Sequence, residues 1–459
     1  MRHCVRRITW TLAAAVTAWS WAAAAQEAPR DPADEPGVFG DPLFAPTFGD
    51  ANADDAPPRD ATPAPLPPSI PTVVRPRRTQ DADPFAAPGS RIGSFVLRGR
   101  LDATAGHSDN ALGTAGGRGS AYGRLAGEAG LTSDWSRHQL DARISGSFTK
   151  FRDLEGADDP ELAARLAGRI DVTREIVVDG EVAAALASLD PGDPNTPGGL
   201  AERSLTQTLS AAAGVTWRPE PFSVRLGGRV SRVLYDDGRL VGGGTVDNGD
   251  RVSTTYGVAL RGAYEVRPGF EVFADVEADN EVYDRRVDQN GLERGSSGTA
   301  VAAGVRIAPS ALVSGEARVG YGHRRYDDPA LDDLTGLIAD ISLAWAPTAL
   351  TTVRVIASSD FSPTTLIGSS GTLTRSGRLE VEHRPRRNVA VTAALEASRA
   401  DYDGTGRIDD ELTAELLLDW RLNRRLSVIG RAAHTKLDSS LPGEDYIATL
   451  FEVGLRLRH

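Results

Sequence analysis

The sequence predicts an all-β protein, a transmembrane, antiparallel, up-and-down β-barrel of about 18 strands. Three observations predict it. Apolar and polar residues alternate in successive segments from residue 91 to residue 459. The segments come as hairpins with unequal ends, tight turns at one end and longer acidic loops at the other. A signal peptide and a proline-rich segment precede them, so that the chain divides into residues 1–25, 26–90 and 91–459.

Composition excludes several other classes of protein. The chain has 459 residues, a formal net charge of −12, one Cys and 40% hydrophobic residues. One Cys excludes a disulfide scaffold, and the acidic balance disfavours a nucleic-acid binder. The composition also leaves no room for many of the apolar runs of about 20 residues that a helical membrane protein needs. Length alone would suggest two or three globular domains, but the alternation overrides that expectation.

Residues 1–25 are typical of a secretory signal peptide. Arg2, Arg6 and Arg7 form a basic start, an apolar run follows, and small residues end at Ala25. An uncleaved membrane anchor is the alternative. Cleavage would also remove Cys4 and change the net charge to −15, because the three arginines leave with the segment (−12 − 3).

Residues 26–90 are dense in Pro, Asp and Ala and show no period of a helix or a strand. Such a segment buries too little apolar surface to offset the entropy of ordering, so we expect a disordered periplasmic tail. Short apolar spots, such as Phe39, Phe48 and Phe85, interrupt it. They are either sparse hydrophobes in a disordered tail or docking motifs for a periplasmic partner.

The alternation has the period of a β-strand with one apolar and one polar face. In the last predicted strand the apolar residues are Phe451, Val453, Leu455 and Leu457. Polar, charged or small residues lie between them. A soluble sandwich would also alternate, and the turns decide between the two folds.

The turns are of two kinds. Tight turns, such as Trp217-Arg218-Pro219 and Trp345-Ala346-Pro347, recur about every 40 residues. Between them lie longer loops rich in Asp, Gly and Asn, among them residues 236–249 and 284–297. Short turns at one end and long loops at the other are typical of an outer-membrane barrel. Eight tight turns plus a first and a last strand predict about 18 strands, with both chain ends on the periplasmic side.

Aromatic residues gather at the predicted strand ends. We expect them to form two belts at the two membrane interfaces, where amphipathic rings are favoured. The belt beside the tight turns comprises Trp135, Trp217, Trp345 and Trp420. The belt before the acidic loops comprises Tyr235, Tyr283, Tyr326 and Tyr402.

Several stretches resemble the putative β-barrel porin 2 family of outer-membrane proteins. They include Asp83-Pro84-Phe85-Ala86-Ala87-Pro88-Gly89, Ser133-Asp134-Trp135-Ser136-Arg137-His138 and Tyr321-Gly322-His323-Arg324-Arg325-Tyr326. The resemblance covers about residues 83–459 and implies the barrel fold and the outer membrane of a Gram-negative bacterium. It also implies a C-terminal aromatic residue that the barrel-assembly machinery recognises, and His459 departs from that pattern.

The polar face of the strands predicts a charged lumen. The candidate lumen-lining residues are Arg98, Arg100, Arg143, Arg169, Arg225, Arg229, Glu265, Asp275, Glu277, Glu316, Arg318, Glu380, Glu415, Asp419, Glu452 and Arg456. These charges either pair across neighbouring strands and stiffen the wall, or form a charged eyelet that selects solutes. Their signs nearly balance, so we expect weak ion selectivity.

No motif indicates catalysis, a cofactor or a metal site. His323 and His434 lack a Ser–His–acid arrangement, and residues 401–410 lack the spacing of an EF-hand. We therefore expect a non-enzymatic, porin-like passive channel for small hydrophilic solutes. The alternatives are an outer-membrane component of a polysaccharide export system, which would dock partners through residues 26–90, or a closed structural barrel. Expected partners are outer-membrane lipids, lipopolysaccharide and the barrel-assembly machinery, with no nucleic acid.

Overall fold

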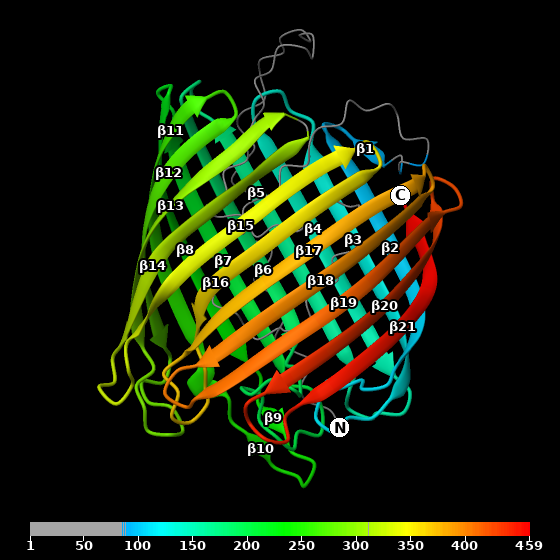
Figure 1. Cartoon of the computed structure of the whole chain (residues 1–459), viewed down its shortest axis with the longest axis vertical. Coiled ribbons are helices and arrows are strands. Elements are labelled where there is room, and N and C mark those ends of the chain that lie inside the picture. The colour runs from blue at the N-terminus through cyan, green and yellow to red at the C-terminus, as the bar shows by residue number, and fades with distance from the viewer. Residues whose placement is uncertain (1–84, 86, 88, 311) are drawn as a thin grey trace. The chain divides into compact units, whose positions relative to one another are not determined.

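Eighteen strands close into one antiparallel barrel (Figure 1). The computed structural model describes Phe85, Ala87, Gly89–Ser310 and Leu312–His459. The predicted signal peptide and almost all of the proline-rich segment lie outside the described residues. The strands are β1 Ser90–Ile92, β2 Phe95–Ser108, β3 Ser120–Ser133, β4 Gln139–Phe151, β5 Asp159–Asp171, β6 Ile176–Ser188, β7 Leu205–Trp217, β8 Phe222–Tyr235, β9 Gly238–Arg239, β10 Thr245–Val246, β11 Ser253–Arg267, β12 Phe270–Tyr283, β13 Ser296–Ser310, β14 Val313–Tyr326, β15 Leu334–Thr348, β16 Thr351–Ser362, β17 Thr372–Arg386, β18 Val389–Tyr402, β19 Arg407–Arg421, β20 Leu426–Ser439 and β21 Tyr446–Arg458.

The first and last long strands close the ring. Strand β21 pairs with β2 from Arg100↔Arg458 to Ser108↔Leu450, and β2 pairs with β3 on its other side. Every other long strand pairs with its two neighbours in sequence. The short strand β1 folds back on β2, and β9 and β10 form a small hairpin inside the β8–β11 loop. Closure pairs the edges that an open sheet would leave exposed. The predicted 18-strand, all-β barrel is confirmed.

The two ends of the barrel differ as the sequence predicts. At one end β11 and β12 are separated by Pro268 and Gly269 alone, and Gly269 has φ = 76°, which favours glycine. At the other end the β6–β7 connection spans residues 189–204 and the β8–β11 connection spans 236–252. Figure 1 shows His459 at the tight-turn end. Among the described residues, no helix is long and apolar enough to cross a membrane.

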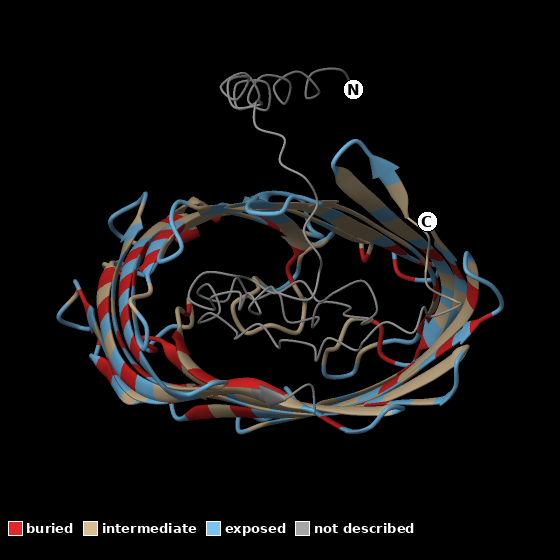
Figure 2. Ribbon diagram, turned by 90° about the horizontal axis from the view of Figure 1, so that it is seen from above, coloured by how far each residue is buried: buried red, intermediate tan, exposed pale blue. Residues whose placement is uncertain are grey.

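The barrel wall carries its large exposed apolar side chains on alternate residues. On β8 these are Phe222, Val224, Leu226 and Val230, and on β21 they are Phe451, Val453, Leu455 and Leu457. The residues between them are small, polar or charged, and many are buried. Figure 2 shows the closed ring of strands with these classes alternating along it. The barrel therefore has an apolar and a polar surface, and the site lies on the polar one.

Candidate functional site

Ion pairs identify the polar surface as the inner one. Arg261 on β11 donates to Asp275 on β12 at 2.6 and 2.7 Å, and to Glu316 on β14 at 3.0 Å. Strands β11 and β14 are separated by β12 and β13, so their backbones lie about 14 Å apart at the spacing of neighbouring strands. Side chains converge only on the concave face of a curved sheet. The charged face is therefore the inside of the barrel.

The same cluster extends along the inner wall. Arg318 donates to Asp340 at 2.6 Å and to Glu277, and also contacts Asp275 at 3.4 Å. Asp275, only 1% exposed, therefore lies between two guanidinium groups. Charge-assisted hydrogen bonds of this kind are about twice as strong as neutral ones. They make this part of the wall rigid and highly charged, with the Phe273 ring packed under the Arg261 guanidinium.

A second cluster covers the closing seam. Arg456 on β21 donates to Asp102 on β2 at 2.8 Å and to Asp419 on β19 at 3.4 Å, and Arg458 also donates to Asp419. On neighbouring strands, Glu415 accepts from several arginines on the inner wall. The Arg456–Asp102 pair joins the last strand to the first, and the other bonds tie β21 and its neighbours to β19.

The structure places the predicted lumen residues as follows. Arg225, Asp275, Glu277, Glu316, Arg318, Glu380, Glu415, Asp419 and Arg456 are in inner-face ion pairs; Arg100 and Arg143 both pair with Glu128; Arg169 pairs with Asp171; Glu452 accepts from the Tyr122 hydroxyl at 3.0 Å. Arg98 and Glu265 share the register of the inner face but are exposed near the tight turns. Arg229 lines a cavity at the opposite end.

The four tryptophans are exposed beside the tight turns. Trp217, Trp345 and Trp420 lie at or near strand ends, on the apolar outer surface. The Trp135 Nε1 atom donates to the Ser94 hydroxyl at 2.9 Å. All four rings are thus exposed beside the tight turns, and their position at a membrane interface stays a prediction.

The four tyrosines of the expected second belt are placed differently. Tyr326 and Tyr402 are 8% and 6% exposed. Tyr235 and Tyr283 line the cavity inside the barrel. The expectation that these residues form an outer aromatic belt is wrong, because each shares the register of the inner charged residues of its own strand. Tyr235, for instance, lies on the same face of β8 as Arg225.

A loop crosses the mouth of the barrel at the long-loop end. We call residues 189–204, the β6–β7 connection, the mouth strap. Asn195 Oδ1 accepts from the Thr364 hydroxyl and from the Thr365 backbone N–H, both at 2.8 Å. Strands β6 and β7 lie almost opposite β16 and β17 in the ring. The mouth strap therefore joins nearly opposite walls, and Figure 2 shows coloured loop segments inside the ring.

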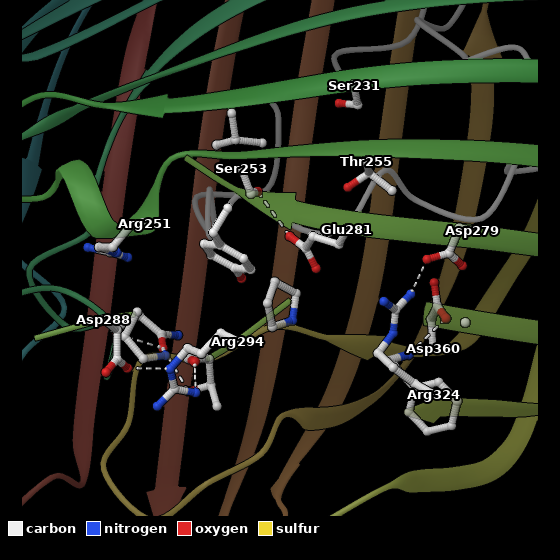
Figure 3. A pocket seen from close by; sticks show the side chains of 18 of the residues that line it. Ser231, Arg251, Ser253, Thr255, Asp279, Glu281, Asp288, Arg294, Arg324 and Asp360 are labelled. Atoms are coloured by element: carbon white, nitrogen blue, oxygen red, sulfur yellow. Dashed lines mark hydrogen bonds and ion pairs between the residues drawn. The ribbon is translucent and has the colours of Figure 1, made fainter. Parts of the chain in front are cut away.

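Beneath the mouth strap lies a cavity of about 370 Å³, the strap cavity (Figure 3). Its walls include Pro194 and Asn195 of the mouth strap, inner residues of β8 and β11 to β16, and Thr364 of the β16–β17 loop. Arg294 anchors its rim. Its Nε donates to Asp288 at 2.7 Å, and its Nη1 donates to the Thr364 carbonyl at 2.7 Å. Three loops are thus held together around one cavity.

Neighbouring groups lower the pKa of two carboxylates at this mouth. Burial tends to raise the pKa of Asp288, but N–H donors from Leu292 and Asn290 and the Arg294 guanidinium outweigh it, so the pKa lies below its usual value. The Arg285 guanidinium likewise lowers the pKa of the exposed Asp247 carboxyl. Both carboxylates are therefore ionised at neutral pH. Within the described residues, no group of three or more His, Cys, Asp or Glu is arranged to hold a metal ion.

Sequence reasoning missed Asn195, Arg251, Arg294 and Thr364. All four lie in loops or in the 3₁₀ turn Gly249–Arg251, where no periodicity marks a side chain as inward. The inward tyrosines did carry a signal, since their register along each strand matches that of the charged residues.

Comparison with known proteins places the chain in a family. Among solved structures, the copper transporter OprC is 12% identical with a TM-score of 0.44, covering 81% of this chain and 82% of that one. The siderophore receptor PiuA from Acinetobacter baumannii is 10% identical with a TM-score of 0.44 and the same coverage. The ferric citrate transporter FecA in its unliganded form is 11% identical with a TM-score of 0.41, covering 75% of this chain and 60% of that one. A search of curated proteins finds no match. A family model described as putative beta-barrel porin 2 matches residues 83–459, which include every strand from β1 to β21.

Proposed function

Since the chain belongs to the putative beta-barrel porin 2 family, and is thus an outer-membrane β-barrel protein, we propose that it is a passive channel for small hydrophilic solutes. The observation that carries this proposal is the inner wall. Its charged clusters run from the closing seam, at Arg456, to the β11–β15 wall, at Arg318. A wall of this kind suits water and polar solutes. Barrels of 16 to 18 strands generally leave an aqueous lumen.

The mouth strap sets the proposed size limit. Because it joins nearly opposite walls through Asn195, it divides the entrance at the long-loop end. Solutes would pass beside it rather than through the full width of the barrel. We therefore propose a conductance below that of an unobstructed barrel of the same strand number.

The paired charges support weak ion selectivity. Ring charges select ions when one sign is left in excess along the path. Here the inner arginines are largely matched by carboxylates, as in the pair Arg261–Asp275.

We propose that both chain ends face the periplasm, with the tight turns, and that the long loops face outward, next to lipopolysaccharide.

Single-channel recording of the refolded full chain in planar bilayers tests the proposal. We expect stepwise conductance, and a reversal potential near zero in a salt gradient. Zero conductance would contradict the channel and favour a closed structural barrel. A reversal potential close to that of a channel that conducts only one ion would contradict weak selectivity but not the proposed channel.

A further inference from the structure

One buried cation in the strap cavity has hydrogen-bond donors without acceptors. Arg251 is 9% exposed, and its Nε and Nη1 atoms have no hydrogen-bond partner among the described residues. Its guanidinium stacks over the Tyr235 ring, 4.2 Å from the ring centre, so its position is fixed. A buried charged donor left without an acceptor is unfavourable. An acceptor brought by a solute would satisfy it.

An anion in the same cavity has neutral partners. Glu281 accepts hydrogen bonds from the hydroxyls of Ser253, at 3.0 Å, and Tyr283. The cation that acts on it from β14, Arg324, is bound to Asp279 at 2.7 Å. Figure 3 shows Glu281 pointing into the cavity, with its bond to Ser253 dashed. A carboxylate surrounded by neutral donors is matched best by a cationic group.

Several other charges of the strap cavity already have partners. Arg294 binds Asp288 and Arg318 binds Glu277. Asp250 accepts from the Gln289 backbone and side chain. Farther along the wall, Arg229 has an unpartnered Nε, and Asp360 accepts the neighbouring N–H of Phe361. The cavity therefore leaves charges of both signs without an ionic partner, which disfavours a ligand of a single sign.

Arg251 and Glu281 both lie near the side chain of Tyr235. Tyr235 is within electrostatic reach of both Arg251 and Glu281. Both residues also line the same cavity of about 370 Å³, which is the size range of small-molecule sites. Apolar surface from Ile338 and Phe361 completes the lining.

We infer that the strap cavity binds small zwitterionic solutes of the α-amino acid class. The solute carboxylate accepts from Arg251, and its ammonium group donates to Glu281. An apolar side chain of the solute packs against Phe361 and Ile338. This inference rests on the proposed channel in that it names the solute class that pauses at the mouth during passage.

Matched solutes test the inference by calorimetric titration of the folded, detergent-solubilised full chain. L-Leucine carries both charged groups, 4-methylpentanoate lacks the ammonium group, and 3-methylbutylamine lacks the carboxylate. We expect saturable binding of L-leucine, and binding of each analogue weaker by about tenfold or more, because each leaves one buried charge unpaired. Equal affinity for the three solutes, or no saturable binding of L-leucine, would overturn the inference.

Variants then assign the two groups. Arg251→Gln and Glu281→Gln should each weaken L-leucine binding by about tenfold. The controls are Arg399→Gln and Asp410→Asn, which change the charge equally in an exposed pair 3.5 Å apart outside the cavity. Arg251→Lys keeps the charge and serves if the glutamine variant does not fold. Unchanged binding in the Arg251 and Glu281 variants would contradict the assignment.

The channel and the inference fail separately. Stepwise conductance without saturable L-leucine binding would overturn the inference and leave the channel. Binding of L-leucine to a barrel that carries no current would overturn the channel and leave the binding site.

Discussion

The Thr364 hydroxyl donates to Asn195 Oδ1 at 2.8 Å, although 169 residues separate the two in the chain. The bond joins loops from nearly opposite walls of the barrel, and Thr365 adds a backbone donor to the same oxygen. One side-chain amide thus fixes the mouth strap across the entrance. In the proposed channel, the width of the entrance would then depend on a contact that a single substitution removes.

Asn195→Ala should release the mouth strap. Each lost hydrogen bond costs about 1 kcal/mol, so losing two raises the population of the released strap by about tenfold or more. We expect larger and noisier single-channel currents in planar bilayers. Asn423→Ala, in the tight turn at the other end of the barrel, is the control and should leave the current unchanged. Equal currents in the Asn195 variant and the wild type would show that the strap does not limit passage.

Acidification should loosen the rim at Asp288. Its pKa lies below the usual value in the folded protein, so the ionised form stabilises the loop above the ordinary aspartate pKa, about 3.9. That contribution is lost as the pH falls through the lowered pKa, when Arg294 loses its partner. We expect faster amide hydrogen exchange in residues 284–295 at low pH, after correction for intrinsic exchange.

Asp288→Asn should show fast exchange of this loop already at neutral pH, with little further change on acidification. Asp438→Asn, which removes the carboxylate of an exposed pair with Lys436 outside this loop, is the control and should leave the exchange of residues 284–295 unchanged. Exchange in the Asp288→Asn protein that still depended on pH like the wild type would rule out Asp288 as the titrating group.

The barrel itself could be predicted because its signals are local. Period-2 alternation, Pro-containing tight turns and their regular spacing fix the strand number without any long-range information. The face of each tyrosine was also predictable, since Tyr235 shares the register of Arg225 on β8. That register outweighs the general preference of aromatic rings for the membrane interface.

The site could not be predicted in the same way. Whether Asp275 reaches Arg318 depends on the stagger of β12 and β14 around the barrel, which no single strand encodes. The meeting of Asn195 with Thr364 depends on loop conformation and on closure of the whole ring. Such contacts follow from the assembled barrel rather than from any local pattern.

Asp275→Asn should destabilise the barrel. It removes the carboxylate from between Arg261 and Arg318, which keep Glu316, Glu277 and Asp340 as partners. Breaking a buried ion pair completely costs about 3 kcal/mol or more, so with these partners left we expect a smaller loss of about 1 to 3 kcal/mol. We expect a lower midpoint of urea unfolding, followed by the heat-modifiable mobility of the barrel in gel electrophoresis. Glu265→Gln, on the inner register of β11 but exposed, is the matched control and should unfold like the wild type.

The exposed tryptophans should report the depth of the tight-turn end in a bilayer. Trp217, Trp345 and Trp420 lie on the outer surface at or near strand ends, where an indole N–H reaches water while the ring meets lipid. We expect lipids brominated near the headgroup to quench their fluorescence more strongly than lipids brominated near the ends of the acyl chains. Leu395, exposed at the middle of β18, gives the internal comparison. In a Trp-free background, Leu395→Trp should show the reverse order, because its ring would face the centre of the bilayer. Stronger quenching of the native tryptophans by lipids brominated near the chain ends would place these residues away from the interface and contradict the prediction.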